Sequence, residues 1–431
     1  MSTARGPRDA LVTGMGFCLP GPDGMTATTQ QFWDVIAGGK SFLKQDDGCY
    51  FGNVSIVEKD IQEKLPEIPE RYLEKYSDLH FYGLLALLEA CADAGFDWRA
   101  GDLTDAALLV ARNGSADLVL DSYLPVLLAD TERTTPQQAR ALLFRNVLNA
   151  VLSDVEATQA GLLRTTGPSY TLSCGCASSS VLLGNAARMI VAGEADIVLV
   201  TGADYWRYDR LRQYAALEER SVTSLEPQTA TLVDEPMRPY DERAAGLNYG
   251  NGAVTMIVES REHAERRGRG GYGRIFGQST SRNAQSNLAI DGKGTAAVRA
   301  ARLCMEGRVT PDEIDYVNGG ATGDRAFNAM EAEIISTLFG ERSAGLPVTV
   351  QEGCFGHSGA PLGNIGVAAT LLMMNHGQVA PTANCEIPAA LCTFDPVPGH
   401  RTAPLRIERA LSLNYTIGSV ASAILLGGAD A

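Results

Sequence analysis

The chain has 431 residues, of which 45% are hydrophobic and 20% charged, so it has the material for a large buried core. Its formal net charge of −15 argues against nucleic acid and anionic membranes as partners, because both require a basic face. Nine cysteines, an odd number without a disulfide-scaffold composition, fit a reducing compartment.

The sequence carries no targeting or metal-binding pattern. Segment 1–6 leads directly into a predicted strand without an apolar signal core, and no apolar stretch approaches the roughly 18 to 20 residues of a spanning helix. No cysteine pair has zinc-finger spacing. We therefore expect a cytoplasmic protein that uses neither a metal nor a membrane.

Short apolar runs with strand character alternate with segments of helical periodicity, which is typical of an α/β protein. The arginine- and glycine-rich segment 261–273 separates two halves of similar size. In chain order the pattern predicts a strand at 10–14, a helix face at 81–91, a strand at 107–111, a helix face at 143–155, a helix at 181–190, and strands at 197–200 and 254–258.

Cys176 lies at a Gly-Cys corner between a short apolar run and the predicted helix that Gly193 ends. The free N–H groups and the positive dipole end of a helix N-terminus favour a thiolate, the form that attacks a carbonyl. Because buried cysteines are common and mostly inert, this pattern alone leaves both a nucleophile and a structural thiol open.

Several segments, in the same order along nearly the whole chain, resemble the β-ketoacyl synthases. Cys176-Ala177-Ser178, the helix behind it and the segment 193–204 resemble the family's nucleophile segment, and Arg238-Pro239-Tyr240-Asp241 is similar to its "RPFD" stretch. The remaining similar segments are 10–16 with 32–39, the family's opening strand and first helix, and 316–318 and 355–357, where its two histidine motifs fall.

The resemblance implies a five-layered αβαβα thiolase fold built from two pseudo-equivalent halves. The first half, residues 1–260, would carry the nucleophilic Cys176. The second half, residues 261–431, would carry His357 and a C-terminal gate loop, with the active site between the halves. Periodicity alone does not give this topology.

Two positions depart from the family's catalytic pattern. The first histidine lies in "VNAHGTGT", whereas residues 317–324 read Val-Asn-Gly-Gly-Ala-Thr-Gly-Asp, so Gly320 takes its position. The second histidine, in "KSxxGH", matches His357, but the lysine five residues before it is replaced by Glu352. An elongating member uses both histidines to decarboxylate a malonyl unit, so the resemblance implies that this apparatus is incomplete here.

The two departures belong to one network, because in the family the lysine contacts the first histidine and the glutamate that matches Glu331. Thr322 and Asn328 lie in the same stretch and are candidate supporting residues. If Glu331 and Glu352 approach each other, repulsion and burial would raise the pKa of one and leave a protonated carboxyl or a poised base. The alternative is that Glu352 turns to solvent.

The C-terminal loop also differs from the family's "FGFGGTNAS", which supplies a gate and an oxyanion-hole N–H. Asn414, Tyr415 and Thr416 are the candidate residues in this chain. Either Tyr415 takes the gate position or Gly418 and Ser419 match the later Gly-Thr, since both cannot hold in one gapless register. The phenol and the amide would make the cavity more polar, or they are satisfied structural groups.

These residues predict an acyltransferase that needs no cofactor. Losing one oxyanion-type donor costs roughly 10² to 10³ in rate, whereas loading of Cys176 should survive. A chain on Cys176 could then react with itself, because internal nucleophiles reach effective molarities of about 10⁵ M or more. Cyclising ketosynthases of γ-lactam-β-lactone (salinosporamide-like) pathways fit this pattern, with His357 as the main proton-transfer group.

The expected partners are an acyl or peptidyl carrier protein with a phosphopantetheine thioester and a second copy in a homodimer. Two other functions remain open. One is a conventional decarboxylating synthase in which another donor replaces the missing histidine. The other is a non-catalytic subunit that resembles a chain-length factor, although such subunits lack the cysteine that Cys176 provides.

Overall fold

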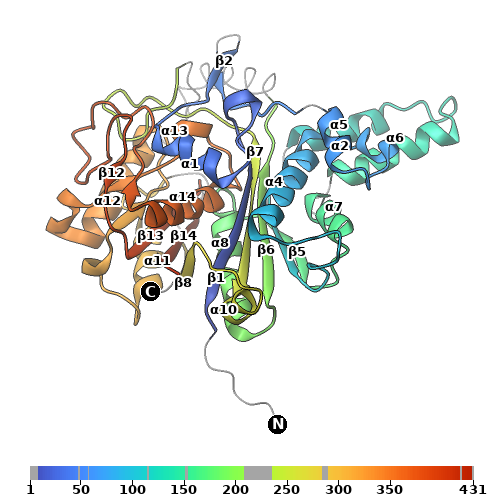
Figure 1. Ribbon diagram of the computed structural model, residues 1–431. Helices are drawn as coiled ribbons and strands as arrows, with labels where there is room; N and C mark the ends of the chain where they lie inside the picture. Colours follow the sequence, from blue (N-terminus) through green and yellow to red (C-terminus); the bar gives the residue numbers. More distant parts are fainter. Residues whose placement is uncertain are drawn as a thin grey trace.

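The computed structural model describes residues 8–46, 49–56, 58–113, 116–150, 154–207, 235–283, 290–417 and 420–429. A ten-stranded sheet runs through the molecule in the order β10-β9-β13-β14-β8-β1-β7-β6-β4-β5 (Figure 1). Its strands are β1 (Ala10–Cys18), β4 (Ala107–Ala111), β5 (Ser169–Leu172), β6 (Ile197–Asp204), β7 (Gly252–Ser260), β8 (Gly273–Arg282), β9 (Tyr316–Asn318), β10 (Val348–Thr349), β13 (Arg409–Tyr415) and β14 (Val420–Gly427).

The sheet repeats one strand pattern twice. In β1-β7-β6-β4-β5 the first two pairs are antiparallel and the last two are parallel. The strands β8-β14-β13-β9-β10 follow the same sequence of directions. The two sets meet where β1 pairs with β8, at Leu11–Arg274 and Val12–Gly273.

Two buried helices, α8 (Ser178–Ala192) and α14 (Leu362–His376), pack against each other near the centre of the molecule in Figure 1. A Cβ built on Gly363 would lie only 2.3 Å from the backbone nitrogen of Ser180, so glycine at 363 permits this close approach. Their N-terminal turns therefore lie side by side. This contact brings the Cys176 turn next to the segment that precedes α14.

Outer helices cover the sheet. The apolar helix α4 (Asp78–Ala94) packs on β1 and β7, and α11 (Thr295–Met305) packs on β8 and β14. The other helices are α1 (Thr29–Ala37), α2 (Glu58–Lys64), α3 (Glu70–Leu73), α7 (Asp154–Leu163), α10 (Arg261–Arg266), α12 (Arg325–Phe339) and α13 (Glu352–Phe355), with 3₁₀ turns at Pro22–Gly24, Pro311–Glu313 and Gly340–Gly345. Two small sheets pair β2 (Lys44–Asp46) with β3 (Cys49–Phe51) and β11 (Gln378–Val379) with β12 (Ala403–Pro404).

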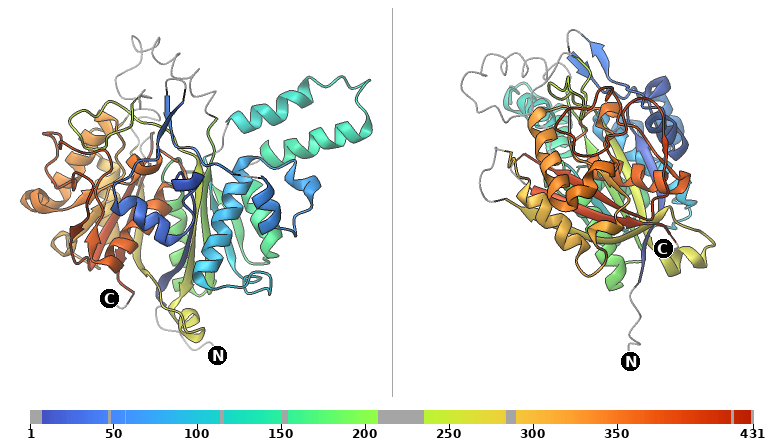
Figure 2. Two further views of the ribbon diagram at one scale, coloured as in Figure 1. Left: turned by 45° about the horizontal axis from the view of Figure 1, so that its top comes forward. Right: turned by 90° about the vertical axis from the view of Figure 1, so that its left-hand side faces the viewer.

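A helical arm, formed by α5 (Ala116–Leu127) and α6 (Pro136–Ala150), projects from the body beside α2 and α7 (Figure 2). The single helix face predicted at 143–155 is wrong here, because α6 ends at Ala150 and Val155 belongs to α7. Leu143 and Val147 are 57% and 61% exposed, so periodicity marked an apolar face that this chain does not bury by itself. The other predicted elements lie within β1, α4, β4, α8, β6 and β7.

No helix in the described ranges combines the length and the apolar character that crossing a membrane requires.

Candidate active site

The Cys176 turn connects β5 to α8 and is held by local hydrogen bonds. Gly175 has φ of +61°, a left-handed conformation that favours glycine. The Ser178 hydroxyl accepts from the Cys174 N–H at 2.7 Å and donates to the Gly175 carbonyl at 2.5 Å. Cys176 is partly buried and lies two residues before α8, so the helix N-terminus that the sequence predicted is present.

Cys176, His357 and Glu352 form a continuous chain of contacts. The Cys176 Sγ lies 3.0 Å from His357 Nε2, and His357 Nδ1 lies 2.9 Å from Glu352 Oε2. Glu352 opens α13 and is only 4% exposed, so the alternative in which it turns to solvent is wrong. Glu352 orients the imidazole so that its other nitrogen faces the sulfur.

The charges next to His357 favour its protonated form, an imidazolium. Burial by itself lowers the pKa of His357, but the neighbouring Cys176 sulfur and the Glu352 carboxylate outweigh burial and raise this pKa well above its usual value. His357 can therefore hold a proton between two anions. A thiolate stabilised by this imidazolium is the attacking species that acyl transfer requires.

The backbone around His357 is fixed on both sides. The His357 N–H donates to the Asn248 carbonyl at 2.8 Å, and the Gly250 N–H donates to the His357 carbonyl at 3.2 Å. The buried Asp204 at the end of β6 accepts from the Ala360 N–H at 2.8 Å and from the Asn113 N–H at 3.1 Å. Burial raises the pKa of Asp204 to about 6, against the effect of these hydrogen bonds.

Glu331, on α12, is fully buried and accepts four hydrogen bonds. The hydroxyls of Tyr240 and Tyr415 donate to it at 2.5 and 2.9 Å, and the N–H groups of Gly320 and Ala321 donate at 2.8 and 3.1 Å. Burial raises the pKa of Glu331, and these four donors oppose the rise. The alternative in which Glu331 and Glu352 act on each other is not what the contacts show: Glu331 binds phenols and backbone N–H groups, whereas Glu352 binds the imidazole of His357.

The remaining candidate residues have mainly structural contacts. The Thr322 hydroxyl accepts from the Asp324 N–H at 3.0 Å, close to the start of α12. Asn328 and Asn414 are buried, and their side-chain oxygens accept no hydrogen bond from any described residue. Thr416 lies against the Cys176 turn, because a Cβ on Gly175 would come within 2.9 Å of its methyl group. The alternative register through Gly418 and Ser419 lies outside the described residues.

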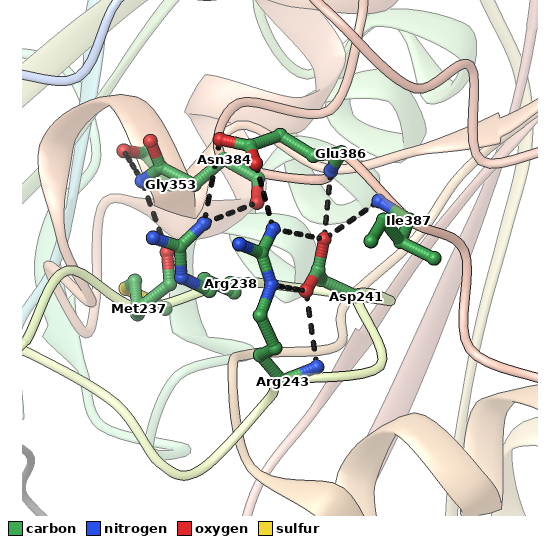
Figure 3. Close-up of polar contacts among 8 residues, drawn as sticks. All are labelled: Met237, Arg238, Asp241, Arg243, Gly353, Asn384, Glu386 and Ile387. Atoms are coloured by element: carbon green, nitrogen blue, oxygen red, sulfur yellow. Dashed lines mark hydrogen bonds and ion pairs between the residues drawn. The ribbon is translucent and has the colours of Figure 1, made fainter.

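A polar network holds the segment that carries Tyr240 against the loop at 384–387 (Figure 3). Asp241 accepts from the Arg243 side chain and from the N–H groups of Glu386 and Ile387. The Asn384 amide donates to the carbonyls of Met237 and of Gly353, the residue after Glu352. The network thus connects the backbone at Tyr240 to the turn that carries Glu352.

Comparison with known proteins identifies the family. Residues 8–264 match the model of the β-ketoacyl synthase N-terminal domain, and residues 272–386 match that of the C-terminal domain. The chain belongs to the β-ketoacyl synthase family. This confirms the family resemblance and the acyl-transferring class of enzyme.

Curated relatives cover most of this synthase. It is 26% identical over 437 residues to the tetracenomycin polyketide synthase ketoacyl synthase alpha subunit of Streptomyces glaucescens, covering 98% of each chain. It is 29% identical over 319 residues to 3-oxoacyl-[acyl-carrier-protein] synthase 1 of Escherichia coli, covering 74% of this chain and 75% of the relative.

Solved structures confirm the thiolase fold. A type II polyketide ketosynthase in complex with its acyl-carrier protein has a TM-score of 0.79 at 21% identity and covers 98% of this chain and 100% of its own. A β-ketoacyl synthase from Burkholderia phymatum has a TM-score of 0.79 at 20% identity and covers 98% of this chain and 99% of its own.

Sequence reasoning placed Tyr240, Ser178 and Asp204 within family segments but missed the contacts by which they shape the site of this synthase. Tyr240 donates to Glu331, and its departure from the "RPFD" pattern was the available signal. Ser178 ties the Cys176 turn together, and Asp204 ties the backbone at Ala360, three residues after His357, to that at Asn113. Their partners are backbone groups, which a side-chain pattern does not reveal. Within the ranges that the structure describes, no cluster of three or more ligating side chains could hold a metal ion.

Proposed function

We propose that this synthase takes an acyl chain from a carrier protein onto Cys176 and then transfers or cyclises it, without decarboxylative elongation. The donor would be a phosphopantetheine thioester on an acyl or peptidyl carrier of polyketide or nonribosomal-peptide metabolism. The proposal rests on the contacts from Cys176 to His357 and from His357 to Glu352, in which a carboxylate replaces the family's lysine and supports the histidine.

Loading of the acyl group requires only the contacts between Cys176, His357 and Glu352 and nearby backbone donors. The Cys176 thiolate attacks the carrier thioester, a new S–acyl bond forms, and the pantetheine thiolate leaves with the proton that His357 supplies. Release of the acyl group uses His357 in the opposite sense, as a base. His357 takes a proton from a hydroxyl, the oxygen attacks the acyl carbon, and the C–S bond to Cys176 breaks.

Decarboxylative condensation lacks support at two positions. Gly320 offers no side chain where the family has its first histidine, and Glu352 is paired with His357. Removing one oxyanion-type donor costs roughly 10² to 10³ in rate. Ring closure within a bound chain avoids this step, because an internal nucleophile has an effective molarity of about 10⁵ M or more. An internal aldol closure followed by alkoxide attack on the thioester, as in γ-lactam-β-lactone pathways, fits these constraints.

We also propose a homodimer. Strand β5 ends the order of the described strands, so its outer edge has no partner there, and its Tyr170 is 39% exposed. The helical arm lies on the same side of the molecule as β5 (Figure 1) and carries exposed apolar side chains. Its exposed large apolar residues are Leu120, Tyr123, Leu124, Leu127, Leu128, Leu143, Phe144 and Val147. A second copy would cover both features.

Intact-protein mass spectrometry with acyl carrier thioesters tests the catalytic proposal. We expect an acyl adduct on the wild type and none on Cys176→Ala. Absence of the wild-type adduct would contradict every catalytic version and favour a non-catalytic subunit. With malonyl carrier added, a chain longer by two carbons would instead identify a conventional elongating synthase. Release of a cyclic product from a nucleophile-bearing chain, without malonate, supports cyclisation.

A further inference from the structure

The position of the family's first histidine is filled by another side chain. A Cβ built on Gly320 would lie 3.0 and 3.1 Å from two ring carbons of Tyr415 and 2.9 Å from the Leu413 carbonyl oxygen. These separations are shorter than ordinary carbon contacts, so the Tyr415 ring lies directly against the backbone at Gly320. Any side chain at 320 would require Tyr415 to move.

Tyr240 packs against the backbone at Gly319 in the same way. A Cβ on Gly319 would overlap the Tyr240 hydroxyl and would lie 2.8 Å from Glu331 Oε2. The family patterns place alanine and histidine where this chain has Gly319 and Gly320, and phenylalanine where it has Tyr240. The two glycines make room for the two tyrosines, so these departures are parts of one arrangement.

Glu331 holds this arrangement in place. It is fully buried, and each of its oxygens accepts one phenolic and one backbone hydrogen bond, so Tyr415 is fixed at its hydroxyl as well as along its ring. Tyr240 has φ of +63°, unusual for a tyrosine, and its neighbours Arg238 and Asp241 are tied to the loop at 384–387 (Figure 3). Tyr415 is 6% exposed, ends β13 and directly precedes Thr416, which lies against the Cys176 turn.

We infer that Tyr240, Gly319, Gly320 and Tyr415 form one unit around Glu331, in which the Tyr415 ring closes the space for a second acyl unit beside Cys176. Tyr415 is then a specificity-determining residue. It leaves the chain on Cys176 to react with its own nucleophile or with a small acceptor. This inference deepens the proposed function and rests on it, since it concerns which substrates the same site accepts.

The closing experiment measures binding of a second acyl unit. Alkylation of Cys176 with iodoacetamide places a short group on the sulfur without a carrier protein, so the measurement does not depend on successful loading. Calorimetry then gives the Kd of the amide analogues of acetyl- and malonyl-pantetheine. We expect Tyr415→Ala to bind the acetyl analogue about tenfold more tightly than the wild type, the scale of one relieved side-chain contact. Tyr415→Phe keeps the ring and should stay within about twofold.

Equal affinities in the wild type and Tyr415→Ala, or tight binding by Tyr415→Phe as well, would overturn the inference. If Tyr415→Ala does not fold, Tyr415→Leu removes most of the ring and provides the same comparison. A failure of carrier loading in the mass-spectrometry experiment would count against the proposed function alone.

Thermal unfolding tests the unit itself. Gly320→Ala should lower Tm, and the loss should be smaller when Tyr415→Ala is already present, because the clashing ring is gone. Gly345→Ala is the matched control, since nothing lies within 4 Å of its added Cβ. Strictly additive losses in the double variant would contradict the contact.

Discussion

At the scale of single residues, Glu352 determines the charge next to His357. A lysine at this position would disfavour a charged imidazole nearby, whereas a carboxylate 2.9 Å from His357 Nδ1 stabilises one. The same substitution removes a cation that an anionic extender unit could use. One change of charge therefore supports proton transfer at His357 and weakens the case for decarboxylation.

Glu352→Gln should weaken the nucleophile without removing it. The raised pKa of His357 depends in part on the Glu352 carboxylate, so the amide lowers that pKa, and the imidazolium loses its proton at lower pH than in the wild type. We expect Cys176 to be alkylated more slowly near neutrality than in the wild type, because less of its sulfur is paired with a charged imidazole. The measurement is the iodoacetamide rate against pH.

Glu333→Gln, an exposed change on α12, is the control for that profile. An unchanged pH profile in Glu352→Gln would show that the carboxylate does not act on His357.

At the scale of elements, the sequence predicts what periodicity encodes. The strands around 10–14, 107–111, 197–200 and 254–258 are found because continuous apolar runs mark buried strands. The arm was not predicted, because an apolar helix face looks the same whether this chain or a partner covers it. The family motifs named Cys176 and His357 as site residues, and the structure brings them into contact, but the contacts of Tyr240 and Glu352 depend on distances that no spacing rule contains.

Asp204 joins three elements, and its replacement should loosen the site. Both of its oxygens accept a backbone N–H, whereas an amide has one acceptor, so Asp204→Asn leaves one buried donor unsatisfied. We expect a loss of about 1–3 kcal/mol in the free energy of unfolding. Denaturant unfolding measures it, with the exposed Asp312→Asn as control.

The same variant gives a pH test with a defined sign. Burial raises the pKa of Asp204 to about 6 in the folded state, above the ordinary value of 3.8, so the folded state binds this proton more tightly than the unfolded state. The contribution of Asp204 to stability is therefore full below pH 3.8 and falls as the pH rises to about 6. The advantage of the wild type over Asp204→Asn should shrink across this window. A difference that grows with pH would contradict the burial of the charge.

At the scale of the whole molecule, the repeated strand pattern gives the site its location. We propose the division into halves at residues 1–260 and 261–431, with Cys176 in the first half and His357 in the second. The contact of α8 with α14 then sets the 3.0 Å approach of sulfur to imidazole. In this division, neither half contains both members of the proposed catalytic pair.

The proposed dimer makes a prediction on the arm. Leu127 and Leu128 are 63% and 74% exposed, so Leu127→Asp/Leu128→Asp should leave the fold of one chain intact and prevent association. Light scattering should give a dimer for the wild type and a monomer for the double variant. Leu303→Asp, at another exposed leucine on α11, is expected to remain dimeric. A monomeric wild type would rule out the dimer.

The Cys176–His357 contact also has a consequence for timing. The sulfur is one of the two anions that keep the proton on His357, and acylation turns that anion into a neutral thioester. Loading the chain therefore lowers the affinity of His357 for its proton at the moment when a base becomes useful. In the proposed mechanism no separate signal is needed to exchange the acid for a base, because acylation of Cys176 itself removes the charge that held the proton.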